Sequence, residues 1–220
     1  MQSLASFISK WDQRNQDAHQ QIALFDTERT KHWNNHQKQL FAQLFYYARG
    51  RFHEFMWIMG NKAPTFEAKE MIVDNFREEF GRHGPSHEQL YLHFANSLGA
   101  SVGTPETYWP FLHEYNQGHW NFLKEKDWDT CAAAFTGYER LDNLDYEDLE
   151  KTAKSIGVSG PALRFFEVHK NANHFEMTSK DLQEIWDKSP QKVIEGFTFI
   201  AEHQNKMWKQ LSDAIFSSKK

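Results

Sequence analysis

The chain has 220 residues, a formal net charge of −5 and 25% charged residues. That is an ordinary composition for one folded domain, and it argues against disorder. No basic run precedes the Lys219–Lys220 tail, so nucleic acid is not expected as a partner. No apolar stretch reaches the roughly 20 residues of a membrane-spanning helix, and the N-terminus lacks the pattern of a signal peptide. With one cysteine, Cys131, there is no internal disulfide. We therefore expect a cytoplasmic protein with a single domain over residues 1–220 and no membrane contact.

The spacing of apolar residues predicts helices throughout. They recur every three or four residues, while glycine and proline are few and clustered. Aromatic residues make up 15% of the chain and supply much of the apolar surface. The expected helices, in chain order, cover about 4–24, 27–59, 65–82, 86–98, 105–117, 119–140, 146–156, 161–177 and 190–216. The predicted fold is all-α, a compact bundle of seven to nine helices.

The first segment with chemical potential joins the third and fourth predicted helices. Two acids, Glu78 and Glu79, close one helix, and His87 opens the next. A helix–loop–helix of this kind can bring a carboxylate and an imidazole to one point. Glu78 shares a helix face with Met71 and Asn75. The alternative is that both acids are surface charges.

Two later segments carry further candidate ligands. Glu139 follows an alanine-rich, aromatic stretch, where a carboxylate must be exposed, be paired or bind a cation. His169, Asn173 and Glu176 are spaced i, i+4 and i+7, so they share one helix face, as a helical metal site requires. His174 is five residues after His169, about 140° around the helix, so both cannot face inward without a bulge. A structural histidine is the alternative at either position.

These three segments together resemble a known group of proteins. The stretch Asn75-Phe-Arg-Glu-Glu-Phe-Gly81, followed by His87-x-x-Leu90 and Phe94-x-x-x-Leu98-Gly99, resembles that group's signature. Tyr138-Glu139 and Phe165-Phe166-x-x-His169 match its later parts. The group contains pyrroloquinoline-quinone synthase C, CADD and the TenA-type proteins. The similarity spans residues 40–215 and implies the haem-oxygenase-like helical fold.

The resemblance also implies a metal site. In the metal-binding branch, the haem-oxygenase-like diiron oxidases, the ligands are a Glu, a His, a second Glu and a last helix reading His-x-x-x-Asp-x-x-His. Carried onto this chain, Glu78 is the first carboxylate, with Glu79 as the other register. His87 is the first imidazole, Glu139 the bridging carboxylate and His169 the start of the last motif.

The last motif departs from the family pattern. Asn173 stands where the family has Asp, and Glu176 stands where it has the final His. A two-residue deletion would make His174 the final ligand, and Glu167-x-x-x-Asn171-x-x-His174 is a third register. Since Asn is a neutral, weak ligand, the sequence leaves open one ion, two ions, or a metal-free enzyme like the quinone-synthase branch.

The preferred function is therefore an iron-dependent oxidase or oxygenase, with manganese as the other candidate metal, that acts on a small-molecule substrate with O₂. Glu78, His87, Glu139 and His169 are the candidate catalytic residues and metal ligands, with His174 and Glu176 as further candidate ligands.

Two alternatives share the fold. One is a cofactor-free enzyme, such as a TenA-type thiaminase with Cys131 as nucleophile, although Gln204 stands where that group tends to carry its acid. The other is a binding protein without catalysis. The resemblance also implies a homodimer.

Overall fold

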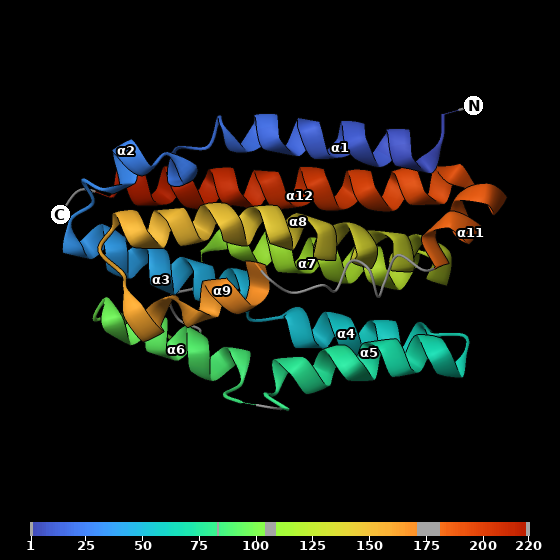
Figure 1. The fold of residues 1–220 in the computed structure, drawn as a ribbon, viewed down its shortest axis with the longest axis horizontal. Helices are drawn as coiled ribbons and strands as arrows, with labels where there is room; N and C mark the ends of the chain where they lie inside the picture. The colour runs from blue at the N-terminus through green and yellow to red at the C-terminus, as the bar shows by residue number, and fades with distance from the viewer. Residues whose placement is uncertain (1, 83, 104–108, 171–180, 219–220) are drawn as a thin grey trace.

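Two 28-residue helices, α8 (Trp128–Ser155) and α12 (Pro190–Ser217), run side by side in the same direction through the molecule (Figure 1). At about 1.5 Å per residue, each is about 42 Å long. Gly196 permits their close approach, because a Cβ at this position would lie 2.6 Å from the backbone nitrogen of Ala134. The computed structural model describes residues 2–82, 84–103, 109–170 and 181–218.

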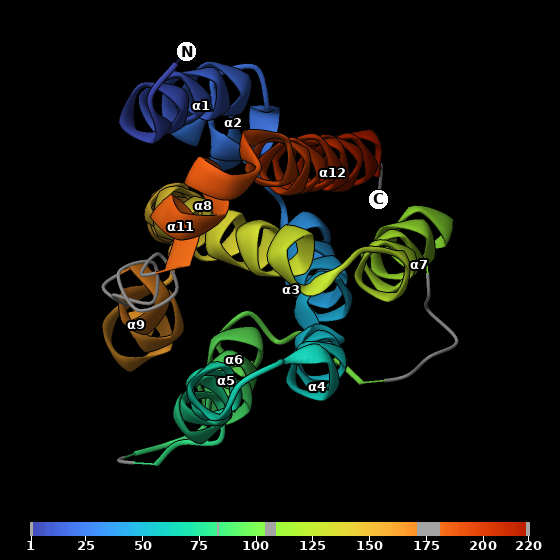
Figure 2. The same ribbon diagram turned by 90° about the vertical axis from the view of Figure 1, so that its right-hand side faces the viewer.

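The other long helices surround this pair in layers (Figure 2). On one side of α12 lies α1 (Leu4–His19), and on the other lie α3 (Asn35–Arg49) and α7 (Pro110–Glu125). A separate lower layer contains α4 (Phe52–Lys62), α5 (Phe66–Glu79) and α6 (His87–Ser97), and α9 (Arg164–Lys170) packs on α8. The short elements are η1 (Ala23–Phe25), α2 (Thr27–Thr30), η3 (Gly160–Leu163) and α11 (Leu182–Lys188). The described ranges contain no strand, so the predicted all-α class is confirmed.

Aromatic side chains fill the core between the upper and lower layers. Phe45 of α3 is 2% exposed and contacts rings from four other helices, with centroid distances of 5.5 to 6.2 Å. Those rings belong to Tyr91, Tyr146, Phe165 and Trp208. Burial of a large apolar side chain contributes about 1.5–3 kcal/mol. This packing ties α3, α6, α8, α9 and α12 together around the candidate site.

The predicted helix over 27–59 is wrong, because three helices occupy that range. Asp26 caps the first turn of α2, and Asn34 with Gln37 forms a capping box that starts α3. A second break at Gly50–Arg51 separates α3 from α4. Capping side chains satisfy the unpaired backbone N–H groups of a new helix, so they mark starts that apolar spacing alone does not show.

The boundaries predicted around Gly118 and residue 140 are also wrong. Helix α7 continues through Gly118, where a Cβ would lie 2.4 Å from Cε1 of His203, so the glycine makes room for that ring. The real break follows Glu125, and Asp127 then caps α8. Helix α8 runs without interruption to Ser155, joining two predicted helices. The C-terminal helix predicted over 190–216 agrees with α12.

Candidate metal centre

Three buried side chains with metal-ligating atoms meet in the lower half of the bundle. They are Glu79 at the end of α5, His87 at the start of α6 and His169 in α9. One donor atom from each lies within 4.8 Å of the other two. Glu79 and His87 are close in the chain, whereas His169 is about 80 residues further on, so the packing of α9 completes the cluster.

A tight turn brings Glu79 and His87 together. Gly81 has φ +80°, the left-handed region that favours glycine, and a Cβ there would lie 2.5 Å from the carbonyl oxygen of Gly84. Ser86 then caps α6 with Gln89 in a capping box. As a result His87 occupies the first turn of α6, directly opposite the last residue of α5.

The register of α5 selects Glu79 rather than Glu78. The buried face of α5 carries Ile72, Asn75, Phe76 and Glu79, spaced three or four residues apart, whereas Glu78 is exposed. The preferred sequence register placed Glu78 with Met71 and Asn75, one position away from the true inward face. The structure therefore places Glu78 outside the cluster and the alternative residue, Glu79, inside it.

In both histidines of the cluster, Nδ1 makes a hydrogen bond. His87 Nδ1 lies 2.7 Å from Glu79 Oε1, and His169 Nδ1 lies 2.7 Å from the carbonyl oxygen of Phe165. A carboxylate and a carbonyl oxygen accept hydrogen bonds, so each Nδ1 carries a hydrogen. The two imidazole centroids are 4.3 Å apart. Such outer hydrogen bonds fix the tautomer and orientation of metal-binding histidines.

Burial sets the protonation of His169. Burial and the neighbouring His87 together lower the pKa of this imidazole to about 3. Tyr146 covers one face of the ring, with centroids 4.2 Å apart and an angle of 12° between the planes. His169 is therefore neutral at physiological pH, which is the form that binds a metal ion.

Glu79 is held in the opposite, charged state. Burial alone would raise the pKa of this carboxyl, but the imidazoles of His53 and His87 beside it hold the pKa well below its usual value. His53 Nε2 is 3.5 Å from Glu79 Oε2, and Arg49 Nη2 is 4.0 Å from the same oxygen. Arg49 is itself fixed by an ion pair of 3.0 Å with Glu88.

A small cavity of about 20 Å³ opens beside the cluster. Glu139, which is 4% exposed, contributes to its wall, as does Asp142 one turn further along α8. The complete lining is Arg49, Phe52, Glu79, Tyr138, Glu139, Asp142, Tyr146 and His169. A space of this size holds one water molecule or one ion. The cavity places Glu139 beside Glu79 and His169, next to the three-residue cluster.

Sequence reasoning missed four residues around the cluster: Arg49, His53, Asp142 and Tyr146. Asp142 had a usable signal, because it follows Glu139 by three residues and so shares its helix face. His53 and Arg49 had none, since the turn between α3 and α4 that aims them at Glu79 was predicted as continuous helix.

The donor set fits a non-haem iron ion. Two imidazole nitrogens and one carboxylate oxygen on a buried face are the ligands of the two-histidine, one-carboxylate sites that bind Fe(II) with positions left open. The sulfur ligands that would favour a structural zinc site do not occur in this cluster.

A family model described as "Iron-containing redox enzyme" matches residues 39–204 of the sequence. The chain belongs to this family. The matched range contains every residue of the cluster and its cavity wall.

Solved structures agree on the fold of this family member. A crystal structure of a CADD-like protein of unknown function from Nostoc punctiforme superimposes with a TM-score of 0.73 and 16% identity, covering 96% of this chain and 98% of that one. A second crystal structure with the same description gives a TM-score of 0.72 and 15% identity, covering 95% and 100%. At such identities the similarity concerns the fold alone. No curated protein matches the chain.

Three of the predicted residues of the last motif lie outside the described residues. They are Asn173, His174 and Glu176, all within 171–180. Their relation to the cluster therefore stays a prediction.

Cys131 does not have the surroundings of a nucleophile. It is fully buried, its Sγ lies 3.6 Å from the carbonyl oxygens of Leu123 and Lys126, and burial raises the pKa of its thiol to about 11. Gln204, at the position of the TenA acid, is occupied in bonds to Tyr115 and Asp145. These contacts argue against the thiaminase alternative in this iron-containing redox enzyme family member.

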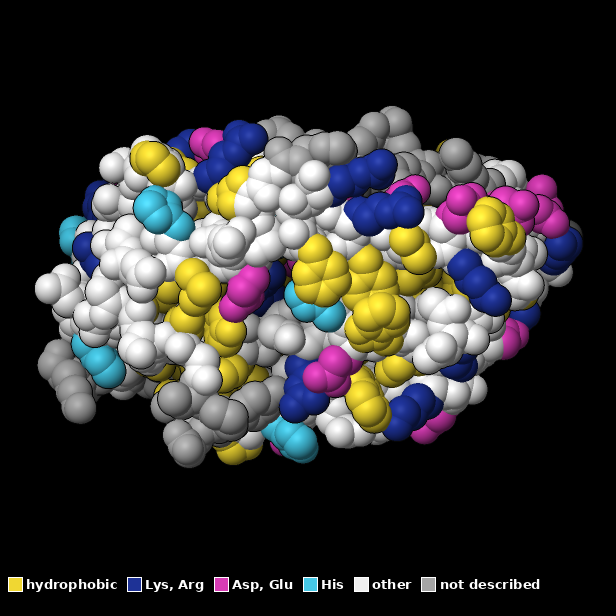
Figure 3. All heavy atoms as spheres, turned by 90° about the horizontal axis from the view of Figure 1, so that it is seen from below, with side chains coloured by type: hydrophobic (Ala, Val, Ile, Leu, Met, Phe, Trp, Pro, Cys, Tyr) yellow, Lys and Arg dark blue, Asp and Glu magenta, His cyan; other side chains and the backbone are white. Residues whose placement is uncertain are grey.

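Exposed aromatic side chains adjoin the cluster on the outside. Figure 3 shows hydrophobic side chains gathered on the face that is seen from below in Figure 1. The exposed large ones in α4 and α5 and at the end of α5 are Trp57, Phe66, Val73 and Phe80. Phe80 stacks on His53 with centroids 5.0 Å apart, and His53 contacts Glu79. This apolar surface therefore comes within two side chains of the cluster. No helix among the described residues is long and apolar enough to cross a membrane.

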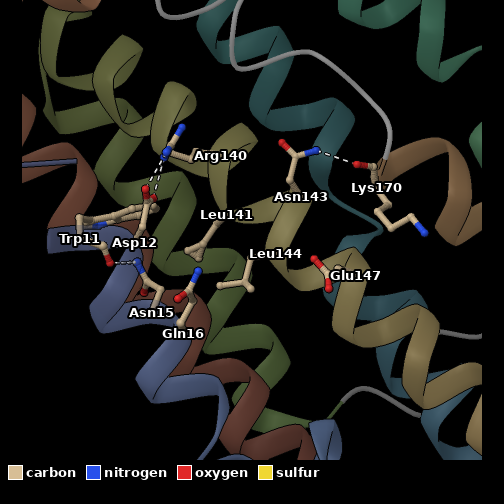
Figure 4. A pocket seen from close by; sticks show the side chains of 10 residues that line it. All are labelled: Trp11, Asp12, Asn15, Gln16, Arg140, Leu141, Asn143, Leu144, Glu147 and Lys170. Atoms are coloured by element: carbon tan, nitrogen blue, oxygen red, sulfur yellow. Dashed lines mark hydrogen bonds and ion pairs between the residues drawn. The ribbon is translucent and has the colours of Figure 1, made fainter. Parts of the chain in front are cut away.

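A larger polar cleft of about 410 Å³ lies elsewhere, between α1 and α8 (Figure 4). Its charged residues are already paired: Arg140 holds Asp12 through two contacts of 2.6 Å, and Lys170 lies 2.5 Å from Glu150. Asn143 donates to the Lys170 carbonyl oxygen at 3.0 Å. Because its charged side chains already pair with each other or with neighbours, this cleft is a weaker candidate for the functional site than the buried cluster.

Proposed function

We propose that the protein is a non-haem iron oxidase or oxygenase that acts on a small-molecule substrate with O₂. The observation that carries this proposal is the buried cluster of Glu79, His87 and His169 in a member of the iron-containing redox enzyme family. Glu79 takes the role that the preferred sequence register gave to Glu78.

The residues around the cluster would have distinct roles. Glu79, His87 and Nε2 of His169 would hold the ion, which when bound supplies electron transfer to O₂. The Phe165 carbonyl and the Glu79 carboxylate orient the imidazoles. Arg49 and His53 hold the charge of Glu79. The buried surroundings keep bulk water away, which strengthens each of these electrostatic contacts.

A second ion would depend on α8. Glu139 and Asp142 supply two carboxyl groups on the same cavity wall, and carboxylates are the common bridging ligands of di-iron sites in helical bundles. His174 or Glu176 would complete such a position. The cavity of about 20 Å³ accommodates one added ion or water.

Anaerobic titration with Fe(II), followed by desalting and metal analysis, tests the proposal. The wild-type chain is expected to retain one or two equivalents of iron. Glu79→Gln keeps the size of the side chain and removes its charge, and it is expected to lower Fe(II) affinity by more than about 100-fold, beyond the effect of an outer-shell change. Glu78→Gln, the exposed neighbour, is the matched control and is expected to bind iron like the wild type.

A wild-type chain that takes up no Fe(II) would overturn the iron proposal and favour a metal-free enzyme or a binding protein. Equal losses in Glu78→Gln and Glu79→Gln would contradict the assigned register. Anomalous scattering at the iron edge then counts the ions and shows whether His174 or Glu176 contacts them. Manganese as the metal, the single domain, the homodimer and the cytoplasmic location stay predictions.

A further inference from the structure

A second, apolar cavity lies on the far side of two residues that also line the metal centre. Phe52 and Tyr138 belong to both linings, and their rings stack with centroids 5.2 Å apart and an interplanar angle of 17°. The free space is about 30 Å³. Aromatic and aliphatic side chains of α4, α7, α8 and α12 form the wall: Phe52, Phe55, Met59, His119, Phe122, Leu123, Ala134, Phe135, Tyr138, Phe199 and Ile200.

His119 is the unusual member of this wall. It is 4% exposed, and its Nε2 has no hydrogen-bond partner among the described residues. Aromatic rings surround the imidazole: Phe55 stacks on it at 4.8 Å, Tyr115 meets it edge-on at 4.8 Å, and Phe199 lies 5.5 Å away. Burial and the neighbouring His203 hold the pKa of His119 well below its usual value, so the ring is neutral.

A buried polar atom without a partner calls for an explanation, because nearly all such atoms in folded proteins are hydrogen-bonded. A trapped water is a poor partner here, since a stable buried water needs two to four polar neighbours and this wall is almost entirely apolar. A bound molecule with an apolar body satisfies both features. It fills the space between the rings and gives His119 Nε2 its missing hydrogen bond.

We infer that this cavity binds the apolar part of the substrate, a small uncharged molecule with a ring or short hydrocarbon body and a hydroxyl or carbonyl group that bonds to His119. A charged group is disfavoured, because none of the lining residues carries a charge to compensate it. A neutral imidazole both donates and accepts, so a hydroxyl or a carbonyl serves equally well. The catalytic part of this inference rests on the proposed function, since the Phe52–Tyr138 pair separates the cavity from the metal centre.

The present space admits only a few atoms, so a ring enters by displacing side chains. Met59 lines the cavity, and its unbranched thioether adapts readily to a new neighbour. Movement of the Phe52–Tyr138 pair would join the cavity to the metal centre and let one molecule reach both.

Binding of three fluorinated probes to the metal-free full chain, followed by ¹⁹F NMR, tests the inference. 4-Fluorophenol has a ring and a hydroxyl, fluorobenzene lacks the hydroxyl, and 4-fluorobenzoate carries a charge. The wild type is expected to bind 4-fluorophenol about tenfold more tightly than fluorobenzene, the effect of one net hydrogen bond, and to reject 4-fluorobenzoate. Binding of 4-fluorophenol is also expected to shift the ¹⁵N resonance of the His119 imidazole.

Variants then locate the contact. His119→Phe is expected to keep fluorobenzene binding, which also shows that it folds, and to lose the tenfold preference. His119→Gln, with its amide, is the second variant and is expected to keep part of the preference. His113→Phe, on the exposed face of the same helix, is the matched control and is expected to behave like the wild type.

Failure of the wild type to bind 4-fluorophenol would overturn the inference, as would binding that is unchanged in both His119 variants or that leaves the His119 resonance in place. Since the probes are added to metal-free protein, such a failure leaves the iron proposal intact. Conversely, a chain that binds 4-fluorophenol through His119 but takes up no Fe(II) would overturn the iron proposal alone.

Discussion

Two buried clusters in this molecule combine imidazole and carboxylate, and they have opposite electrostatics. In the candidate metal centre, two histidines lie beside the single carboxylate of Glu79, and of these only His87 bonds to it. In the upper part of the bundle, one histidine, His19, lies between two carboxylates, with Nε2 2.9 Å from Asp145 and Nδ1 2.9 Å from Asp148. The ratio of imidazole to carboxylate is reversed.

That reversal changes the state of the imidazole. Burial lowers the pKa of His169 to about 3, because no carboxylate bonds to it. Burial acts in the same direction on His19, but the two aspartates outweigh it and raise its pKa to about 9. His19 is therefore a cation at neutral pH, whereas His169 is a neutral ligand.

The two clusters also differ in what remains available for binding. Asp145 accepts hydrogen bonds from Gln204 at 2.5 Å and from Trp208 at 2.8 Å, in addition to its ion pair. The His19 cluster is thus satisfied within the protein and stabilises the fold. The Glu79 cluster has Glu79 and the neutral imidazole of His169 in the wall of a cavity. Buried histidine by itself indicates neither role; the groups that surround it decide between structure and binding.

Replacing one histidine in each cluster is expected to have the largest effect, because it separates the metal-binding role of one cluster from the structural role of the other. His169→Ala should lower Fe(II) affinity by more than about 100-fold, because it removes a ligand rather than an outer-shell group. His19→Ala should leave Fe(II) affinity within about threefold of the wild type. Isothermal titration under anaerobic conditions measures both. A folded His19→Ala chain that loses iron to the same extent would show that the clusters act as one unit.

The dependence of stability on pH is expected to sharpen the contrast further. The pKa of His19 in the folded chain, about 9, lies above the ordinary value of 6.5. Its contribution is therefore complete below pH 6.5 and is lost as the pH rises through about 9. At about 1.4 kcal/mol per pKa unit, that contribution is on the order of 3 kcal/mol.

Urea unfolding at pH 6 and pH 9.5 measures this term. The free energy of unfolding of the wild type should fall between the two pH values, and the fall should be largely absent in His19→Gln. His32→Gln changes an exposed histidine and serves as the control. An equal pH dependence in His19→Gln and the wild type would contradict the charged state assigned to His19.

A smaller effect is expected from the turn that joins Glu79 to His87. Gly81→Ala forces a side chain into the left-handed region and against the Gly84 carbonyl, which should cost about 1–2 kcal/mol of stability and weaken Fe(II) binding. Gly157→Ala is a matched control, since Gly157 also has a positive φ, +97°, but open space around its Cβ. It should lose stability without losing iron. Unchanged iron affinity in Gly81→Ala would show that the turn does not position the ligands.

Local pattern allowed some elements to be predicted well and others badly. The C-terminal helix was placed correctly, because Pro190 marks its start and apolar spacing continues along its length. The predicted 27–59 helix was wrong because apolar spacing continues across the caps at Asn34 and the break at Gly50. Gly118 was taken as a break, but it lies inside α7, where it makes room for His203 from a distant helix. Distant packing of this kind leaves no local signal.

The candidate site was likewise predicted correctly in part and incorrectly in part. His87, Glu139 and His169 were named from residue type and motif, and all three are buried: His87 and His169 in the cluster, and Glu139 in the wall of the cavity beside it. The sequence preferred Glu78, but the structure places Glu79 in the cluster. The sequence did not separate the two acids because adjacent residues differ by only about 100° around the helix. The inward direction followed from Ile72 and Phe76, whose burial depends on contacts across helices.

By itself, the sequence determined that this chain is all-helical, that aromatic residues fill its core and that carboxylate and imidazole groups recur at helical spacing. These properties depend on residues close together in the chain, so periodicity reveals them. Only the tertiary structure decided which carboxylate faces the histidines, which buried histidine is charged and which Nε2 atoms remain without partners. Each of those depends on the burial and the neighbours supplied by helices that are distant in the chain, and desolvation and charge act through space rather than along the chain.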